Sequence, residues 1–317
     1  MKKVLCAVGI ASLIAAITYL VLTPASPEQK IKRDALKAIA LIKSRPILTT
    51  LRATIRDSDF TDSAKPNVPA RETSLDFVTA DVIAQLERML DDPDFGVVID
   101  VAITLNVVDP NNPLPLEKLV VLLDTQSDSK IAIIHAIGRF GPRAKLAIPR
   151  LLALLKDQDE STLSFTVQTL GYIGPDSDIA VHDLIPLLNN KDDGVVDDVA
   201  QCLGRIGARA NEAVPALIGR YPSCSTRVRI AIIQALGKIR TEREVIVRFF
   251  DGILADTKAK SSELTYTLYN LPQLIINEDP VLENVEKLLQ HRDDDVLRAA
   301  NWVLERTKAV QPKAALQ

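Results

Sequence analysis

A motif of two glycines recurs along this chain with a fixed period of 33 positions. The first glycine of each motif falls at Gly138, Gly171, Gly204 and Gly237, and the first three of these are followed three residues later by a second glycine. Seven of the twelve glycines in the chain occupy these positions. Such a period is typical of repeat arrays, in which each unit packs against its neighbours and the core grows in one dimension. The spacing therefore predicts an array of repeats rather than one or two ordinary globular domains.

Each period also contains an aliphatic stripe with helical spacing. Apolar side chains recur at positions i, i+3, i+4 and i+7 from Ile148, Val181 and Val214. These stripes predict the first helix of a two-helix unit, with the second helix running up to the glycines. The second glycine stands where a left-handed closing residue is expected, and Pro142 and Pro175 then prevent continuation of the helix. The first glycine lies in the last helical turn, where its cost of about 1 kcal/mol predicts close approach of a neighbouring helix.

A polar series with the same period marks the turn after each first helix. Its side chains can satisfy free backbone amides in the turn or cap the following helix. The composition agrees with a helical array, because 47% of residues are apolar and only 4% are aromatic. The members of the polar series are Asp91, Asp124, Asp157, Asn190, Ser223 and Asp256.

The amino-acid sequence of these repeats resembles that of a known family. Leu-Gly-x-Ile-Gly-Pro at 170–175, Ala-Val-Pro-x-Leu-Ile at 213–218 and the Asp-rich turns are similar to bacterial HEAT repeats, especially the short HEAT-like type of phycobilisome lyases. The resemblance covers residues 75–309. It implies an all-α fold, an α-solenoid in which HEAT-like helical hairpins form a right-handed superhelix with the second helices on the concave face. Near the ends of the array, other residues replace the first glycine, namely Leu105, Asn270 and Val303.

The N-terminus carries a membrane signal. Two lysines precede an uncharged apolar run over residues 4–22, which as a helix is about 28 Å long and matches a bilayer core. This predicts an uncleaved transmembrane anchor. A cleaved signal peptide is the alternative, because Thr23 and Ala25 are small enough to precede a cleavage site. We expect a single-pass protein of the bacterial inner membrane with an extracytoplasmic array, or a secreted, periplasmic protein if the signal is removed.

Charge is segregated along the chain. Residues 28–56 carry eight Lys or Arg against two acids, although the whole chain has a net charge of -3. Helical spacing here predicts short amphipathic helices, which can lie on anionic lipid headgroups through residues 30–56 or form a solvated stalk or capping repeat. The predicted parts are a signal segment (1–26), a basic helical stalk (27–58), a linker (59–74), the repeat array (75–309) and a flexible tail (310–317).

Polar residues recur at two equivalent positions of the predicted second helices. The two positions are four residues apart, which is about one helical turn, so their side chains lie on the same face of each helix. Concave faces of repeat arrays commonly bind partners, and the alternative is a solvated face without a partner. We call this candidate binding surface the polar strip, and it consists of His135, Arg139, Gln168, Tyr172, Gln201, Arg205, Gln234 and Lys238.

The sequence offers little for catalysis, and we predict no catalytic residues, metal site or cofactor. The three histidines are far apart in the chain and have no second ligand at helical spacing. No Gly-rich phosphate loop, nucleophile elbow or calcium loop is present. Cys202 occupies the repeat position that is Ala136 and Ala235 in other repeats, which indicates a packing role. Its expected distance from Cys224 argues against a disulfide.

Three functions are compatible with an array of this kind. The favoured one is a non-catalytic, membrane-tethered or exported scaffold that binds a protein or peptide through the polar strip. The alternative is a tetrapyrrole (bilin) lyase-like enzyme, suggested only by the type of repeat. Nucleic-acid binding is disfavoured, because residues 57–317 are net negative and aromatic side chains are scarce.

Overall fold

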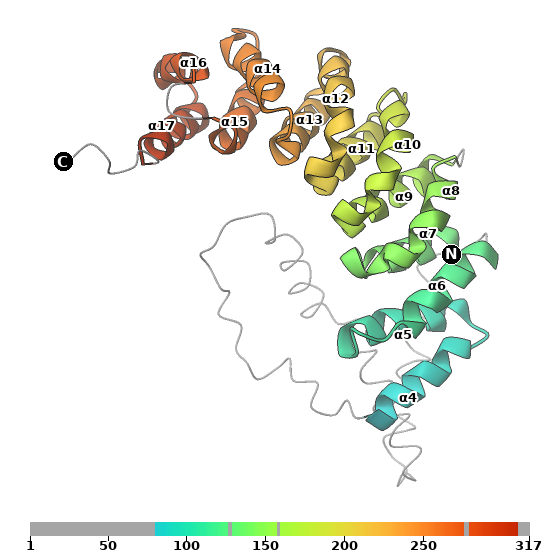
Figure 1. Cartoon of the computed structure of the whole chain (residues 1–317). Coiled ribbons are helices and arrows are strands. Elements are labelled where there is room, and N and C mark those ends of the chain that lie inside the picture. The colour runs from blue at the N-terminus through green and yellow to red at the C-terminus, as the bar shows by residue number, and fades with distance from the viewer. Residues whose placement is uncertain (1–79, 126–128, 157–158, 276–278, 310–317) are drawn as a thin grey trace, which may run out of the picture. The chain divides into compact units, whose positions relative to one another are not determined.

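The computed structural model describes residues 80–125, 129–156, 159–275 and 279–309 (Figure 1). These residues form α-helices joined by turns and short 3-10 helices, and no β-strand occurs among them. The all-α array of two-helix units is thus confirmed for this part of the chain. The predicted signal segment, stalk, linker and tail lie outside the described residues. Within the described ranges, no helix is both long and apolar enough to cross a bilayer.

The chain divides into two compact units, the first of which ends at Leu119. It contains α4 (Ala80–Arg88), η1 (Met89–Asp91), α5 (Phe95–Val108) and the start of α6 (Leu114–Thr125). The Asp94 carboxylate accepts a hydrogen bond from the Gly96 amide at 2.8 Å and so caps α5. Leu105, which stands at a position of the first glycine series, is fully buried in this unit.

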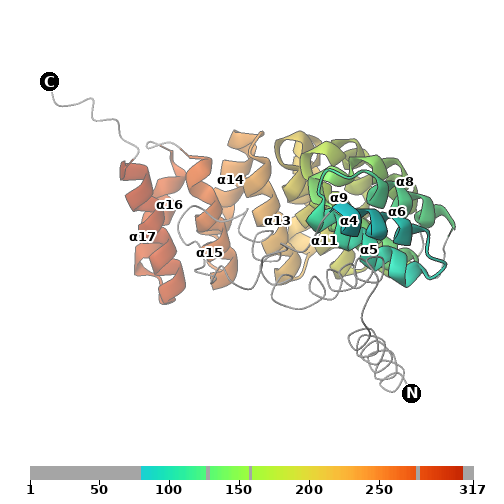
Figure 2. The same ribbon diagram turned by 90° about the horizontal axis from the view of Figure 1, so that it is seen from below.

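The second unit begins at Val120 and contains the remaining helices in two layers. The second helices α9, α11, α13, α15 and α17 pack on one another in chain order, starting from α7. Figure 1 shows them on the inner side of the curve of this unit, and Figure 2 shows α11, α13, α15 and α17 side by side. We call these six second helices the inner layer.

The bounds of the helices in this unit are as follows. The inner layer consists of α7 (Lys130–Gly138), α9 (Glu160–Ile173), α11 (Asp193–Ile206), α13 (Thr226–Ile239), α15 (Ser261–Asn270) and α17 (Asp294–Ala309). The outer helices are α8 (Ile148–Leu154), α10 (Val181–Leu187), α12 (Val214–Arg220), α14 (Arg243–Ala255) and α16 (Val281–Lys287). The 3-10 helices are η2 (Gly141–Ala147), η3 (Gly174–Ala180), η4 (Gly207–Ala213), η5 (Tyr221–Ser223), η6 (Leu271–Gln273) and η7 (Leu288–Gln290).

The second glycine of each motif closes an inner helix with a positive φ. Gly174 has φ 76° and ψ -137°, and Gly207 has φ 72° and ψ -138°. The positive φ confirms the predicted closing role. The ψ values differ from the predicted left-handed helical region, and they approach a region that is essentially restricted to glycine. One period later Arg240 takes the same place with φ 58° and ψ -5°, which is left-handed helical.

The first glycine of each motif lies where two inner helices approach closely, as predicted. A Cβ at Gly204 would lie 2.8 Å from the Cα of Ala235, and a Cβ at Gly171 would lie 3.1 Å from the Cα of Cys202. A contact of 2.8 Å is essentially never seen for a real Cβ atom, and a contact of 3.1 Å is shorter than nine in ten of those observed. Each of these glycines therefore permits a helix contact through backbone atoms. Cys202 lies in such a contact and is fully buried, which confirms its predicted packing role.

The prediction that Asn270 replaces a first-series glycine is wrong. Its side chain lies against Gly237, in the place that Ala235 occupies against Gly204. The contact joins residues 33 positions apart, whereas the contact at Gly204 joins residues 31 positions apart. The connection between α13 and α15 is thus two residues longer than the preceding one, and it contains an outer helix of 13 residues instead of 7. This insertion shifts the sequence register of the inner layer after α13 by two residues.

Candidate functional site

The structure places the whole polar strip on consecutive helices of the inner layer. His135 lies on α7, and Arg139 is the residue that closes this helix. The other six members lie in pairs on α9, α11 and α13. All eight are exposed or half-buried, while residues between them, such as Leu170 and Leu203, are buried. The strip is therefore a continuous surface feature within the second unit.

The centre of the strip contains a cation–π pair. The Arg205 guanidinium carbon lies 4.7 Å from the centre of the Tyr172 ring, and 37% of Tyr172 is exposed. Among the described residues, no ion pair joins Arg205 to a carboxylate. Its observed contact is with the ring face, so a ligand carboxylate can approach the guanidinium.

Two glutamines of the strip bind aspartates of α11. The Gln168 amide donates hydrogen bonds to both carboxylate oxygens of Asp198 at 3.0 Å, so that it links α9 to α11. The Gln201 amide donates to Asp197 at 3.1 Å. Asp197 is 3% exposed and forms an ion pair of 2.6 Å with Arg227 of α13. Gln168 thus links α9 to α11, and the pair of Asp197 and Arg227, which Gln201 supports, links α11 to α13. The sequence analysis did not assign these roles.

The strip continues beyond α13 through residues that sequence reasoning missed. A strict period of 33 leads from Gln234 and Lys238 to Thr267 and Leu271, both of which are fully buried. When two residues are added to the period at this step, it leads to exposed side chains of α15 and the following turn. A further step of 33 residues from these positions leads to α17. The added residues are Tyr269, Gln273, Trp302 and Arg306.

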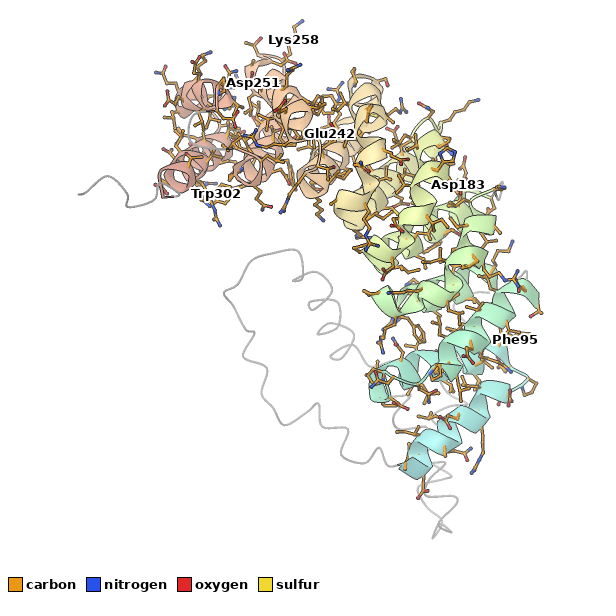
Figure 3. The ribbon with its side chains drawn as sticks, in the orientation of Figure 1. Phe95, Asp183, Glu242, Asp251, Lys258 and Trp302 are labelled. Atoms are coloured by element: carbon orange, nitrogen blue, oxygen red, sulfur yellow. The ribbon has the colours of Figure 1, made fainter. Side chains whose placement is uncertain are left out.

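These added residues have contacts like those at the centre of the strip. The rings of Tyr269 and Trp302 lie edge to face with their centres 5.5 Å apart. The Arg306 guanidinium carbon lies 4.9 Å from the centre of the Trp302 ring. Figure 3 shows Trp302 on α17, on the inner side of the second unit. We call the polar strip together with these four residues the extended strip.

Both described cysteines and His135 lie in contacts with neighbouring side chains or backbone. Cys202 and Cys224 are both buried free thiols, and burial raises the pKa of Cys202 to about 12. His135 contacts Phe165 edge to face, with ring centres 6.3 Å apart. Within the described ranges, no three His, Cys, Asp or Glu side chains are arranged so that they could hold a metal ion.

A buried polar cluster joins the turn after α12 to helices α13 and α15. Glu263 is 2% exposed, accepts a hydrogen bond from the Tyr221 hydroxyl at 3.0 Å, and lies 3.5 Å from an Arg229 nitrogen. The Arg229 guanidinium carbon lies 5.2 Å from the centre of the Tyr221 ring. Burial, followed by the Glu263 carboxylate, raises the pKa of Tyr221 above its ordinary value. The three groups contact one another, which indicates a structural role between successive repeats.

Comparison with known proteins gives one family match. Residues 148–237, which cover α8 to most of α13, match the family model described as HEAT repeats. A comparison with curated protein sequences gave no significant match.

Several solved structures resemble this chain at low identity. An archaeal HEAT-like repeats protein from Thermococcus onnurineus NA1 is 13% identical, with a TM-score of 0.48, over 72% of this chain and 97% of that one. The complex of CpcE and CpcF of phycocyanin lyase from Nostoc sp. PCC7120 is 19% identical, with a TM-score of 0.43, over 78% and 100%. Importin beta is 14% identical, with a TM-score of 0.49, over 89% of this chain and 40% of that one.

Proposed function

This chain is a HEAT-repeat protein, and we propose that it is a non-catalytic scaffold that binds a protein partner through the polar strip. The observation that carries the proposal is the pair formed by Arg205 and Tyr172, an exposed ring and a cation without a carboxylate partner in the described part of the chain. Arg and Tyr are the residue types that most often dominate the binding energy of protein interfaces.

The packing of the inner layer supports this use of its surface. Glycine contacts bring the helix backbones together at Gly171 and Gly204, and the Gln168 bonds to Asp198 connect the same helices. A surface built on closely packed helices keeps its side chains in place before a partner arrives, so less entropy is lost on binding. Burial raises the pKa of Cys202 to about 12, so this residue does not supply a thiolate nucleophile.

We also propose that the apolar run over residues 4–22 attaches the scaffold to a membrane, with the basic stalk at residues 30–56 near anionic headgroups. The length of the run and its lack of charge support this attachment. In cells that express the full chain, we expect the protein in the membrane fraction after a carbonate wash. Deletion of residues 4–22 should release it, and a full-length protein found in the soluble fraction would contradict the tether.

Site-specific photo-crosslinking tests the binding face. A photoreactive phenylalanine analogue at position 172 of the full chain, which keeps an aromatic ring there, should form a covalent adduct with another polypeptide in living cells. The same amino acid at position 248 is the matched control, because Arg248 is exposed on the outer helix α14. Adducts from position 172 only would support the proposal. Adducts from position 248 only, or from neither position, would show that the polar strip does not bind a protein.

A further inference from the structure

The extended strip has a charge opposite to that of the chain as a whole. Its twelve side chains include four cations and no Asp or Glu, although the chain has a net charge of -3. The cations are Arg139, Arg205, Lys238 and Arg306, and they lie on four different helices or helix ends of the inner layer. A long positive row favours an acidic ligand over a basic one.

Aromatic rings lie between these cations. Tyr172 contacts Arg205, and Trp302 contacts both Tyr269 and Arg306. Trp302 is the single tryptophan of the chain. The guanidinium groups of Arg205 and Arg306 are thus held on a ring face with their N–H groups at the edge of the pair, and this position suits bidentate bonds to a carboxylate. The rings themselves offer apolar surface to the backbone or to proline rings of a bound segment.

The spacing of the inner helices selects the conformation of such a segment. Packed helices lie about 8 to 10 Å apart, and the contacts at Gly171 and Gly204 show that the inner helices pack directly on one another. A polyproline II segment repeats its side-chain direction every three residues, and its turn advances about 9.3 Å. A β-strand repeats its direction after about 6.6 Å, which does not match the helix spacing. One turn of a polyproline II segment therefore spans one HEAT repeat.

We propose that the extended strip binds an acidic polyproline II segment of a partner protein, with a carboxylate at every third residue. This inference rests on the proposed function and specifies the partner's chemistry. Carboxylates of the segment lie against Arg139, Lys238 and the Arg205 guanidinium, which covers the Tyr172 ring. The exposed surface of that ring contacts the proline rings between the carboxylates.

Binding of a synthetic peptide to the full chain tests this proposal. The probe is a labelled peptide of five Glu-Pro-Pro triplets, and the readouts are its fluorescence anisotropy and the emission of Trp302. We expect saturable binding that weakens with added salt and changes the Trp302 emission. A peptide of the same composition with its glutamates consecutive, and one with Lys in place of Glu, should bind about ten-fold more weakly or not at all.

Two arginine variants complete the test. Arg205→Gln should weaken binding of the Glu-Pro-Pro peptide by about ten-fold. The matched variant Arg248→Gln on α14 should leave binding unchanged, and circular dichroism should show that both variants keep their helices. Tyr172→Ala provides a second variant, which should weaken binding without a change of charge.

Several results would overturn the proposal. The spacing is wrong if the peptide with consecutive glutamates binds as tightly as the triplet peptide. The partner class is wrong if a single-stranded oligonucleotide of equal charge binds more tightly. If adducts form at position 172 in cells but the triplet peptide does not bind, the strip recognises a partner of other chemistry. If no adduct forms there, the proposed function itself fails.

Discussion

The guanidinium of Arg205 lies over the ring of Tyr172, and the two residues are one full repeat apart in the chain. Tyr269 and Trp302 are separated by the same interval, and their rings are also in contact. Equivalent positions of consecutive repeats thus touch along the inner layer. The polar strip is a row of neighbouring side chains, so a change at one position also alters the surroundings of the next.

Charge reversal in the strip should abolish partner capture and leave the fold intact. We expect the triple variant with Glu at positions 139, 205 and 238 to lose adduct formation from position 172. Its helix content should stay the same, because these side chains lie outside the core. Circular dichroism and the crosslinking yield are the two measurements. An unchanged yield would show that these cations do not contribute to binding.

Gly174→Val should destabilise the array by about 1 to 3 kcal/mol, because the native φ of 76° is unfavourable for a β-branched residue. Urea denaturation of the variant and the native protein measures this difference. Gly219→Ala is the matched control, since Gly219 lies inside α12 and an added Cβ there meets no atom within 4 Å. We expect it to stabilise the protein by about 0.5 to 1 kcal/mol. Equal effects of both substitutions would contradict the role of backbone conformation.

Gly204→Ala should destabilise more than Gly138→Ala. The added methyl group at Gly204 meets the Cα of Ala235 at 2.8 Å, and a backbone atom can move only with its helix. At Gly138 it meets the Thr169 hydroxyl at 3.0 Å, and a side chain can move by rotation. We expect about 1 to 3 kcal/mol at Gly204, the usual range for overpacking. The order of the two unfolding midpoints in urea decides this prediction.

Stability should fall at alkaline pH through Tyr221. Its pKa is raised in the folded protein, so the unfolded chain releases the proton first as the pH rises above about 10, the usual value for tyrosine. The stabilisation is therefore complete below about pH 10 and is lost at higher pH.

Tyr221→Phe tests this pH dependence. At pH 8 the variant should be less stable by about 1 to 3 kcal/mol, because the hydrogen bond to the Glu263 carboxylate is lost. At pH 11 the difference from the native protein should be smaller, since the variant lacks the titrating hydroxyl. Urea denaturation at both values measures it. A difference that is equal at pH 8 and pH 11 would contradict the raised pKa.

The thiol of Cys202 should resist alkylation in the folded protein. Burial raises its pKa to about 12, so almost no thiolate is present near pH 8. We expect iodoacetamide to modify this residue only after unfolding in urea, as measured by mass spectrometry of the peptide that contains it. Cys224 should behave similarly, because burial raises its pKa as well. Rapid modification of Cys202 in the native protein would show that α11 does not pack against Gly171 as described.

Most of the array follows from local patterns that can be read along the chain. The aliphatic stripes from Ile148, Val181 and Val214 begin the outer helices α8, α10 and α12. The second glycines close the inner helices, and the first glycines lie at close contacts between helices. These features depend on helical periodicity and on the conformational freedom of glycine, and both are properties of short segments. For this reason the predicted two-helix units agree with the structure.

The last four members of the extended strip could not be predicted in this way. Sequence period alone assigns Thr267 and Leu271 to the strip, but they are buried, and Tyr269 and Gln273 take their places. The signal was present in the chain, because no glycine follows Gly237 at the next step of the period. The missing glycine does not show which residue of α15 contacts α13. That contact depends on the packing of the longer helix α14.

The sequence by itself determined the repeat period, the helical hairpin as its unit and the central members of the strip, because each depends on interactions within one or two turns of a helix. Only the tertiary structure decided that Asn270 fills the space at Gly237, that Gln168 bonds to Asp198, and that Arg205 rests on Tyr172. These contacts join residues about one repeat apart, and a difference of two residues in one connection changes which side chains meet.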